Sequence, residues 1–122
     1  MLEFSQLAKT WIIDVDGTIV KHNGYITDGH DSLLEGVKEF FASISEDDKV
    51  ILLTARRKEY IEPLKNFLKQ NNIRYDVLLS DMPVGERILI NDKKTSGLKT
   101  AFAINKNRDD KFEFEYTLRE DV

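Results

Sequence analysis

The stretch that decides the fold is Trp11-Ile12-Ile13-Asp14-Val15-Asp16-Gly17-Thr18, an apolar run that ends in two aspartates one residue apart. Its β-branched residues predict a short buried strand over residues 10–15. Gly17 permits a sharp turn there, because glycine reaches backbone angles closed to other residues. Two carboxylates that end a buried strand need a cation, hydrogen bonds or water. Since open α/β sheets bind ligands at the carboxyl ends of their strands, we interpret this strand end as a candidate active site.

The rest of the chain alternates apolar runs with helical patterns. Residues 1–9 are expected to form a lead-in turn or short helix, and residues 19–31 a loop or small hairpin beside the aspartates. Further strands are predicted at 50–53, 75–79, 87–90 and 100–104, and helices at 32–44, opened by a Ser32–Glu35 capping box, and at 56–70. Such alternation predicts a three-layer α/β/α sandwich with a mainly parallel, Rossmann-like sheet.

The final residues, 109–122, have a different pattern. Phe112, Phe114, Tyr116 and Leu118 alternate with polar residues, which is the period of a half-buried strand. We expect an edge strand or hairpin that packs on its own domain. The alternative is a subunit contact, which would make a homo-oligomer.

Length and composition bound the class of protein. The 122 residues suit one domain, with a formal net charge of -4 and a pI near 5.2. This balance argues against a dominant nucleic-acid or anionic-membrane surface. Without cysteine, disulfides and thiolate sites are excluded. No signal peptide or membrane span is recognised, so a cytoplasmic location is expected.

The segment Asp14-Val15-Asp16-Gly17-Thr18 resembles the signature of the haloacid dehalogenase superfamily of phosphohydrolases. A calcium loop of the EF-hand type is disfavoured, because Thr18 and Tyr25 stand where its ligands would be. The resemblance extends to about residue 108. Neither residues 19–49 nor residues 56–87 leave room for a cap domain. The chain therefore looks most like small capless phosphatases, which include those of capsule or surface-polysaccharide synthesis and the phosphatase module of polynucleotide kinases.

The resemblance implies roles for the strand-end residues. Asp14 would be the nucleophile that forms an aspartyl-phosphate, and Asp16 the general acid and then the base. Thr54, which follows the apolar run 50–53, would hydrogen-bond the phosphoryl oxygens. The residues expected to bind phosphate are Gly17, Thr18, Thr54, Ala55 and Arg56.

A magnesium site is also implied by the resemblance. Mg²⁺ takes hard oxygen ligands and keeps several waters. Asp14, the backbone carbonyl of Asp16 and an acid from Asn91-Asp92 would hold it. Relatives often carry two aspartates at the last position, whereas this chain has Asn91 first. We prefer Asp92 as the ligand, with Asn91 as the alternative.

One expected residue is missing from the pattern. The superfamily supplies a lysine that neutralises the nucleophile and the phosphoryl group, but Met82 stands at its place. Lys93 is our first choice as a substitute. Arg87 and Lys94 are the alternatives.

These expectations lead to one function and two alternatives. The first is a Mg²⁺-dependent phosphomonoester hydrolase acting on a sugar phosphate or another bulky phosphoester, such as a carrier-linked sugar. The alternatives are a catalytically weakened module that binds phosphate or a phosphosugar, and a polynucleotide-end phosphatase. The acidic composition makes nucleic acid the less favoured partner.

Overall fold

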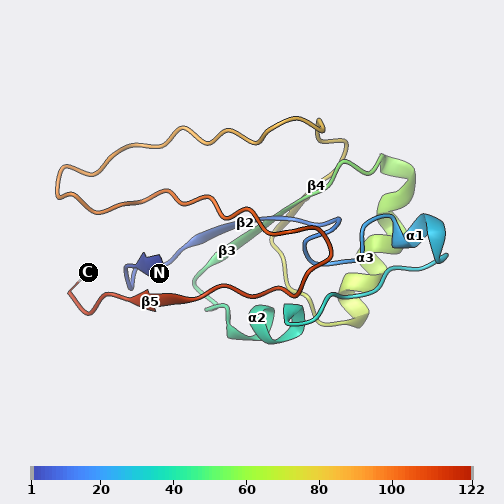
Figure 1. Cartoon of the computed structure of the whole chain (residues 1–122), viewed down its shortest axis with the longest axis horizontal. Helices are drawn as coiled ribbons and strands as arrows, with labels where there is room; N and C mark the ends of the chain where they lie inside the picture. Colours follow the sequence, from blue (N-terminus) through green and yellow to red (C-terminus); the bar gives the residue numbers. More distant parts are fainter. Residues whose placement is uncertain (1, 122) are drawn as a thin grey trace.

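A computed structural model of the protein describes residues 2–121, which form two small parallel sheets and a few helices (Figure 1). In chain order the elements are β1 (Leu2–Phe4), β2 (Thr10–Asp14), α1 (Gly24–Thr27), α2 (Val37–Ser43), β3 (Lys49–Leu53), the 3₁₀ helix η1 (Lys58–Tyr60), α3 (Ile61–Gln70), β4 (Val77–Leu79) and β5 (Tyr116–Leu118). The chain is therefore a small α/β domain with parallel strands.

The larger sheet has the strand order β2-β3-β4, and all three strands are parallel. Ile13 lies opposite Leu52, and Leu52 lies opposite Leu78. These strands confirm the predictions at residues 10–15, 50–53 and 75–79, with ends shifted by one or two residues. Because the strands are parallel, their carboxyl ends, and the polar residues that follow them, lie at one edge of the sheet.

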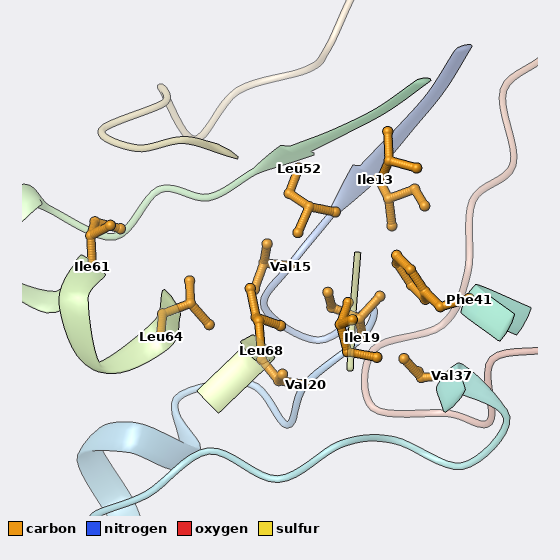
Figure 2. Packing of buried hydrophobic residues seen from close by; sticks show 12 residues of the cluster. Ile13, Val15, Ile19, Val20, Val37, Phe41, Leu52, Ile61, Leu64 and Leu68 are labelled. Carbon is orange, nitrogen blue, oxygen red and sulfur yellow. The ribbon is translucent and has the colours of Figure 1, made fainter. Parts of the chain in front are cut away.

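One face of this sheet carries the core. Figure 2 shows side chains from β2 and β3 packed against α2 and α3, in a cluster that includes Ile13, Leu52, Val37, Phe41, Leu64 and Leu68. The opposite face is partly open, because Ile12 is 51% exposed and Val77 is 43% exposed. Within residues 2–121 no helix covers that face, so the predicted third layer is absent there.

Helix α2 begins later than the sequence predicts. The capping box at Ser32 is wrong as a helix start, since α2 begins after Gly36, whose φ of 89° is left-handed. Residues 33 and 34 instead lie along the motif loop: Leu33 forms a bridge with Val20, and the Leu34 amide donates to the Ile19 carbonyl at 3.0 Å. These pairings hold residues 33 and 34 outside the helix, and a turn at residues 35 and 36 then leads into α2.

Helix α3 confirms the second half of the predicted helix at 56–70. Ile61, Leu64 and Leu68 are buried as expected, and Pro63 falls in the first turn, where no backbone N–H is needed. Arg56 and Arg57 precede η1 and lie outside the helix. No helix within residues 2–121 has both the length and the apolar character that crossing a bilayer requires.

The two ends of the described chain form the smaller sheet. β1 pairs in parallel with β5, so the prediction of a lead-in turn or short helix is wrong for residues 2–4, and a bend follows at residues 6 and 7. The alternating tail packs on its own chain, as expected: the Phe112 ring lies 4.8 Å from Phe40, and the Tyr116 ring 4.9 Å from Phe4. Burial of these rings against the domain holds the tail in place.

Residues 83–104, here called the excursion, depart furthest from expectation. The strands predicted at 87–90 and 100–104 are wrong, since neither range forms one. The excursion leaves the end of β4, runs away from the domain and returns (Figure 1). Ile88 and Ile90 are 81% and 92% exposed. An apolar run becomes a strand only where a neighbour pairs with it, and β2 pairs with β3 alone among the described strands.

Candidate active site

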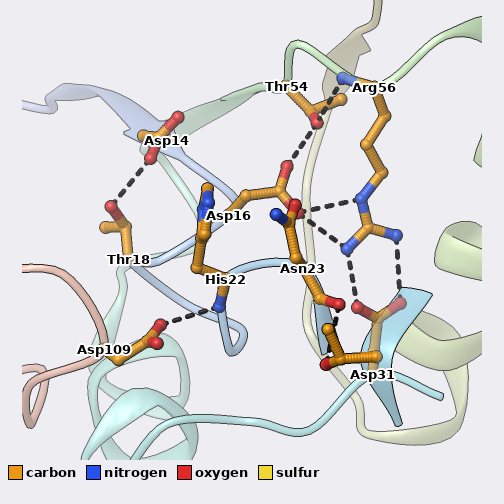
Figure 3. A network of polar contacts seen from close by, with 10 residues as sticks. Asp14, Asp16, Thr18, His22, Asn23, Asp31, Thr54, Arg56 and Asp109 are labelled. Atoms are coloured by element: carbon orange, nitrogen blue, oxygen red, sulfur yellow. Dashed lines mark hydrogen bonds and ion pairs between the residues drawn. The ribbon is translucent and has the colours of Figure 1, made fainter. Parts of the chain in front are cut away.

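The motif aspartates lie where β2 and β3 end together. Asp14, the last residue of β2, lies opposite Leu53, and the Val15 amide donates to the Leu53 carbonyl at 2.9 Å. Thr54 therefore follows its strand beside the motif. Gly17 then turns the chain with a φ of 81°, which a side chain would strain. Figure 3 shows the Asp14 carboxylate facing Thr18 and the Asp16 carboxylate facing Thr54 and Arg56.

Asp16 is held by two neighbours from the end of β3. Thr54 is fully buried, and its Oγ1 donates to Asp16 Oδ2 at 2.6 Å. The Arg56 Nε donates to Asp16 Oδ1 at 2.9 Å, and Nη2 lies 2.8 Å from the same oxygen. The Thr54 hydroxyl in turn accepts the Arg56 amide at 3.1 Å. This network fixes the carboxylate that the sequence assigns to proton transfer.

Asp31 is the second carboxylate on Arg56, and it belongs to the loop that precedes α2. The guanidinium of Arg56 and the carboxylate of Asp31 form a bidentate ion pair, in which Nη1 donates to Oδ2 at 3.1 Å and Nη2 donates to Oδ1 at 2.6 Å. Arg56 is only 4% exposed and Asp31 only 9%. Burial alone would lower the pKa of Arg56, but the hydrogen bonds and charges of Asp31 and Asp16 outweigh it and raise that pKa. Arg56 therefore stays charged and joins the loop to the site.

Asp14 is the more accessible of the motif aspartates. Its Oδ2 accepts the Thr18 hydroxyl at 2.9 Å, and its Oδ1 accepts Arg87 Nη1 at 3.0 Å. The side chains of Arg87 and Asp14 are 42% and 35% exposed, so solvent and ligand can reach the pair. A cation thus lies against the predicted nucleophile, although the residue at the usual lysine position is Met82, whose backbone amide donates to the Thr54 carbonyl at 3.1 Å.

Residues 106–109, which are distant in sequence, contact the turn at Gly17. The Asp109 amide donates to the Gly17 carbonyl at 2.9 Å, and Asp109 Oδ1 accepts the His22 amide at 2.7 Å. Lys106 Nζ reaches the same Gly17 carbonyl at 3.4 Å. The Arg108 side chain lies so close that a Cβ added at Gly17 would come within 3.2 Å of its Cγ. Two basic side chains, Lys106 and Arg108, and the carboxylate of Asp109 therefore lie beside the motif loop.

The structure brings most of the predicted phosphate-binding set together. Thr54 and Arg56 are hydrogen-bonded to Asp16, and Thr18 is hydrogen-bonded to Asp14. Gly17 and Thr18 lie in the turn itself, and Ala55 is exposed between Thr54 and Arg56. The bonds predicted between these residues and phosphate remain predictions.

Three predicted residues lie elsewhere, in the excursion. Asn91, Asp92 and Lys93 are exposed. Asn91 Nδ2 donates to the Thr100 hydroxyl at 3.2 Å, and that hydroxyl donates to the Asp92 carbonyl at 3.1 Å. Within residues 2–121 no three acidic or histidine side chains cluster as a metal site. The donors in this arrangement therefore do not fit the expected magnesium site, because the strand that was to carry Asn91 and Asp92 does not form.

Sequence reasoning missed Asp31 as part of the site. It lies in a polar, glycine-punctuated loop, where no periodicity or motif distinguishes a buried ion-pair partner from a solvated acid. Arg87 was recognised only as an alternative, because it was assigned to the start of a strand. Its contact with Asp14 depends on the path of the excursion, which local sequence does not determine.

Comparison with known proteins gives two solved structures. No protein-family model matches the chain, and no curated protein matches it. A chain of the Pnkp1/Rnl/Hen1 complex is 34% identical, with a TM-score of 0.53, over 68% of this chain and 31% of that one. A chain of the Pnkp1/Rnl/Hen1 RNA repair complex is also 34% identical, with a TM-score of 0.52, over 70% of this chain and 29% of that one. The protein is thus similar in sequence and fold to less than a third of a chain that belongs to an RNA repair complex.

Proposed function

We propose that the protein is a phosphomonoester hydrolase with Asp14 as its nucleophile. The observation that carries the proposal is the meeting of Asp14, Asp16 and Thr54 at the adjoining ends of β2 and β3. Two carboxylates, a buried hydroxyl and charged guanidinium groups are the parts that phosphoryl transfer through an acyl-phosphate uses. The Asp14 side chain is 35% exposed, which suits an attacking group, and Asp16 is the other motif carboxylate, to which the proposal assigns the proton transfer.

The two steps follow from these positions. A carboxylate oxygen of Asp14 attacks phosphorus, the bond from phosphorus to the leaving oxygen breaks, and protonated Asp16 gives its proton to that oxygen. Water then attacks the aspartyl-phosphate, Asp16 takes the proton from the water, and the bond from phosphorus to Asp14 breaks. Inorganic phosphate and the free carboxylate result. The guanidinium of Arg87, 3.0 Å from Asp14, would neutralise the phosphoryl oxygens as they approach.

Magnesium remains a prediction that needs its own test. When bound, the ion would neutralise charge between the nucleophile and the phosphoryl oxygens. Only Asp14 and Asp16 of the expected ligands lie at the site, and the residues of the excursion do not complete the set. The two steps above are therefore assigned to protein groups alone.

We propose the phosphorylated end of a nucleic acid as the substrate class. The similarity to chains of an RNA repair complex supports this choice over the sugar phosphate. Net charge alone argues the other way, with a value of -4. A local surface decides phosphate binding, however, and Lys106, Arg108 and Arg87 gather at the motif. Within residues 2–121 no cap domain lies over the site, which leaves room for the end of a long chain.

Phosphate release from a defined panel tests the proposal. The panel contains oligoribonucleotides phosphorylated at the 3′ or the 5′ end and a set of sugar phosphates, each with Mg²⁺ and with EDTA. Wild type is compared with Asp14→Asn and with the matched control Asp47→Asn, which makes the same change in an exposed turn. We expect release from an oligonucleotide end that Asp14→Asn abolishes and Asp47→Asn retains.

Two results would contradict this proposal. Release by Asp14→Asn at the wild-type rate would remove Asp14 as the nucleophile. Release from sugar phosphates but not from oligonucleotide ends would return the substrate class to the one first expected from the sequence. Loss of release in EDTA, restored by Mg²⁺, would establish the metal requirement separately.

A further inference from the structure

Two tyrosines form a pair beside the candidate proton donor. Tyr25 lies in α1 and Tyr60 ends η1, and their ring centroids are 5.4 Å apart at an interplanar angle of 58°. The Arg56 guanidinium lies 3.8 Å from the centroid of the Tyr25 ring. Since Arg56 also binds Asp16, contacts run from Asp16 through Arg56 and Tyr25 to Tyr60.

The two rings have different surroundings. Tyr25 is half-buried on the guanidinium, where a cation over an aromatic face is stabilised, and burial raises the pKa of its hydroxyl. Tyr60 is 48% exposed and is not part of the hydrophobic core. Holding a large ring in solvent gains little for the fold. Tyr60 is therefore the ring that is available to a ligand, and the Tyr25 ring packs against it.

We propose that Tyr60 stacks on the terminal nucleobase of the substrate, which makes it the residue that selects nucleotides. The proposal rests on the proposed function, in which Asp16 protonates the leaving oxygen. The leaving group must then lie on the Asp16 side of the site, which is the side of the tyrosine pair. Arg56, which binds Asp16, lies 3.8 Å from the centroid of the Tyr25 ring, and that centroid lies 5.4 Å from the centroid of the Tyr60 ring.

Stacking suits an unpaired nucleic-acid end better than other phosphoesters. Bases in single-stranded ends are free to stack on aromatic side chains, and every base offers a π-face. One such contact accounts for about a 5- to 100-fold change in affinity when the aromatic ring is removed. Preference for a base, without preference for its identity, is the expected signature.

The test compares two oligoribonucleotides that differ only at the phosphorylated residue, which is a normal nucleotide in one and an abasic ribose in the other. Phosphate release is measured with wild type, Tyr60→Ala and the conservative Tyr60→Phe. Affinity is measured in parallel by fluorescence anisotropy with Asp14→Asn, alone and combined with each Tyr60 variant. Circular dichroism confirms that each variant is folded.

We expect wild type to favour the base-bearing end by about 5- to 100-fold in kcat/KM. Tyr60→Ala should lose that preference, whereas Tyr60→Phe should keep it. Equal affinity of Asp14→Asn for both oligonucleotides, or a preference that survives Tyr60→Ala, would overturn the stacking role even if hydrolysis occurs. Absence of hydrolysis with a Tyr60-dependent affinity difference would instead overturn the proposed function and leave the stacking role supported.

Discussion

Replacing Arg56 by alanine is the sharpest test of how the site is held. The side chain is 2% exposed and is the hydrogen-bonding partner of both Asp31 oxygens, while the Asp31 side chain is 4% exposed. Arg56→Ala would leave this buried carboxylate without its cation. Breaking a buried ion pair by removing one member costs about 3–5 kcal/mol. We therefore expect a loss of that size in the free energy of unfolding.

The same loss can be expressed as a change in melting temperature. An unfolding entropy of about 2.1 cal/mol/K per residue gives about 0.26 kcal/mol/K for a chain of this length. Arg56→Ala should then melt about 12–20 °C below wild type. The raised pKa of Arg56 means that its contribution is lost only as pH rises through that pKa, so the difference should be constant across neutral pH.

Urea denaturation followed by the fluorescence of Trp11, the single tryptophan, measures the loss. Arg57→Ala is the matched control, because Arg57 is the exposed neighbour, and we expect it to stay within about 0.5 kcal/mol of wild type. Asp31→Asn combined with Arg56→Ala should recover part of the loss, since the buried Asp31 carboxylate no longer lacks a cation. Equal stabilities of Arg56→Ala and Arg57→Ala would show that Asp31 is solvated and would refute the reasoning.

Three further variants test the packing around the site by equilibrium unfolding. Leu64→Ala, at a fully buried position, should lower the free energy of unfolding by about 2–5 kcal/mol. A decrease below about 1 kcal/mol would place Leu64 outside the core. Gly36→Ala should lower the free energy of unfolding by at least about 1–2 kcal/mol, because the φ of Gly36 is 89° and the new Cβ would collide with the Phe112 carbonyl. Unchanged hydrogen exchange at the Phe112 amide would contradict this expectation. Asp48→Ala should lower the free energy of unfolding by about 1–3 kcal/mol, because the Lys9 amide and the Trp11 indole each donate to Asp48 at 2.9 Å. Wild-type stability of this variant would show that water replaces the carboxylate.

Local sequence was sufficient for the parts of the site that follow buried strands. Runs of β-branched and aliphatic residues located β2, β3 and β4 because these strands pair with neighbours that are equally apolar. The placement of Asp14, Asp16 and Thr54 at one sheet edge then follows from parallel pairing. Helix α3 was found from its buried face, and the tail from its alternation.

What sequence reasoning missed depends on contacts between distant segments. The apolar run at 87–90 has the composition of a strand, but a strand also needs an unpaired neighbour in register, and composition says nothing about that. The capping signal at Ser32 did not start the helix, because Leu33 and Leu34 pair with Val20 and Ile19 and α2 begins only after Gly36. Asp31 resembles any loop carboxylate until the fold buries it against Arg56.

The closure of the motif turn by Asp109 has a consequence for the order in which the protein can fold. The hydrogen bond from the His22 amide to Asp109 spans 87 residues of sequence. During synthesis, the motif loop therefore leaves the ribosome long before Asp109, which completes it, has been added to the chain. Contacts of such high sequence separation slow folding, because a long loop must close before they form. A nascent chain ending before residue 109 should hold the strands of the larger sheet but not the completed motif turn.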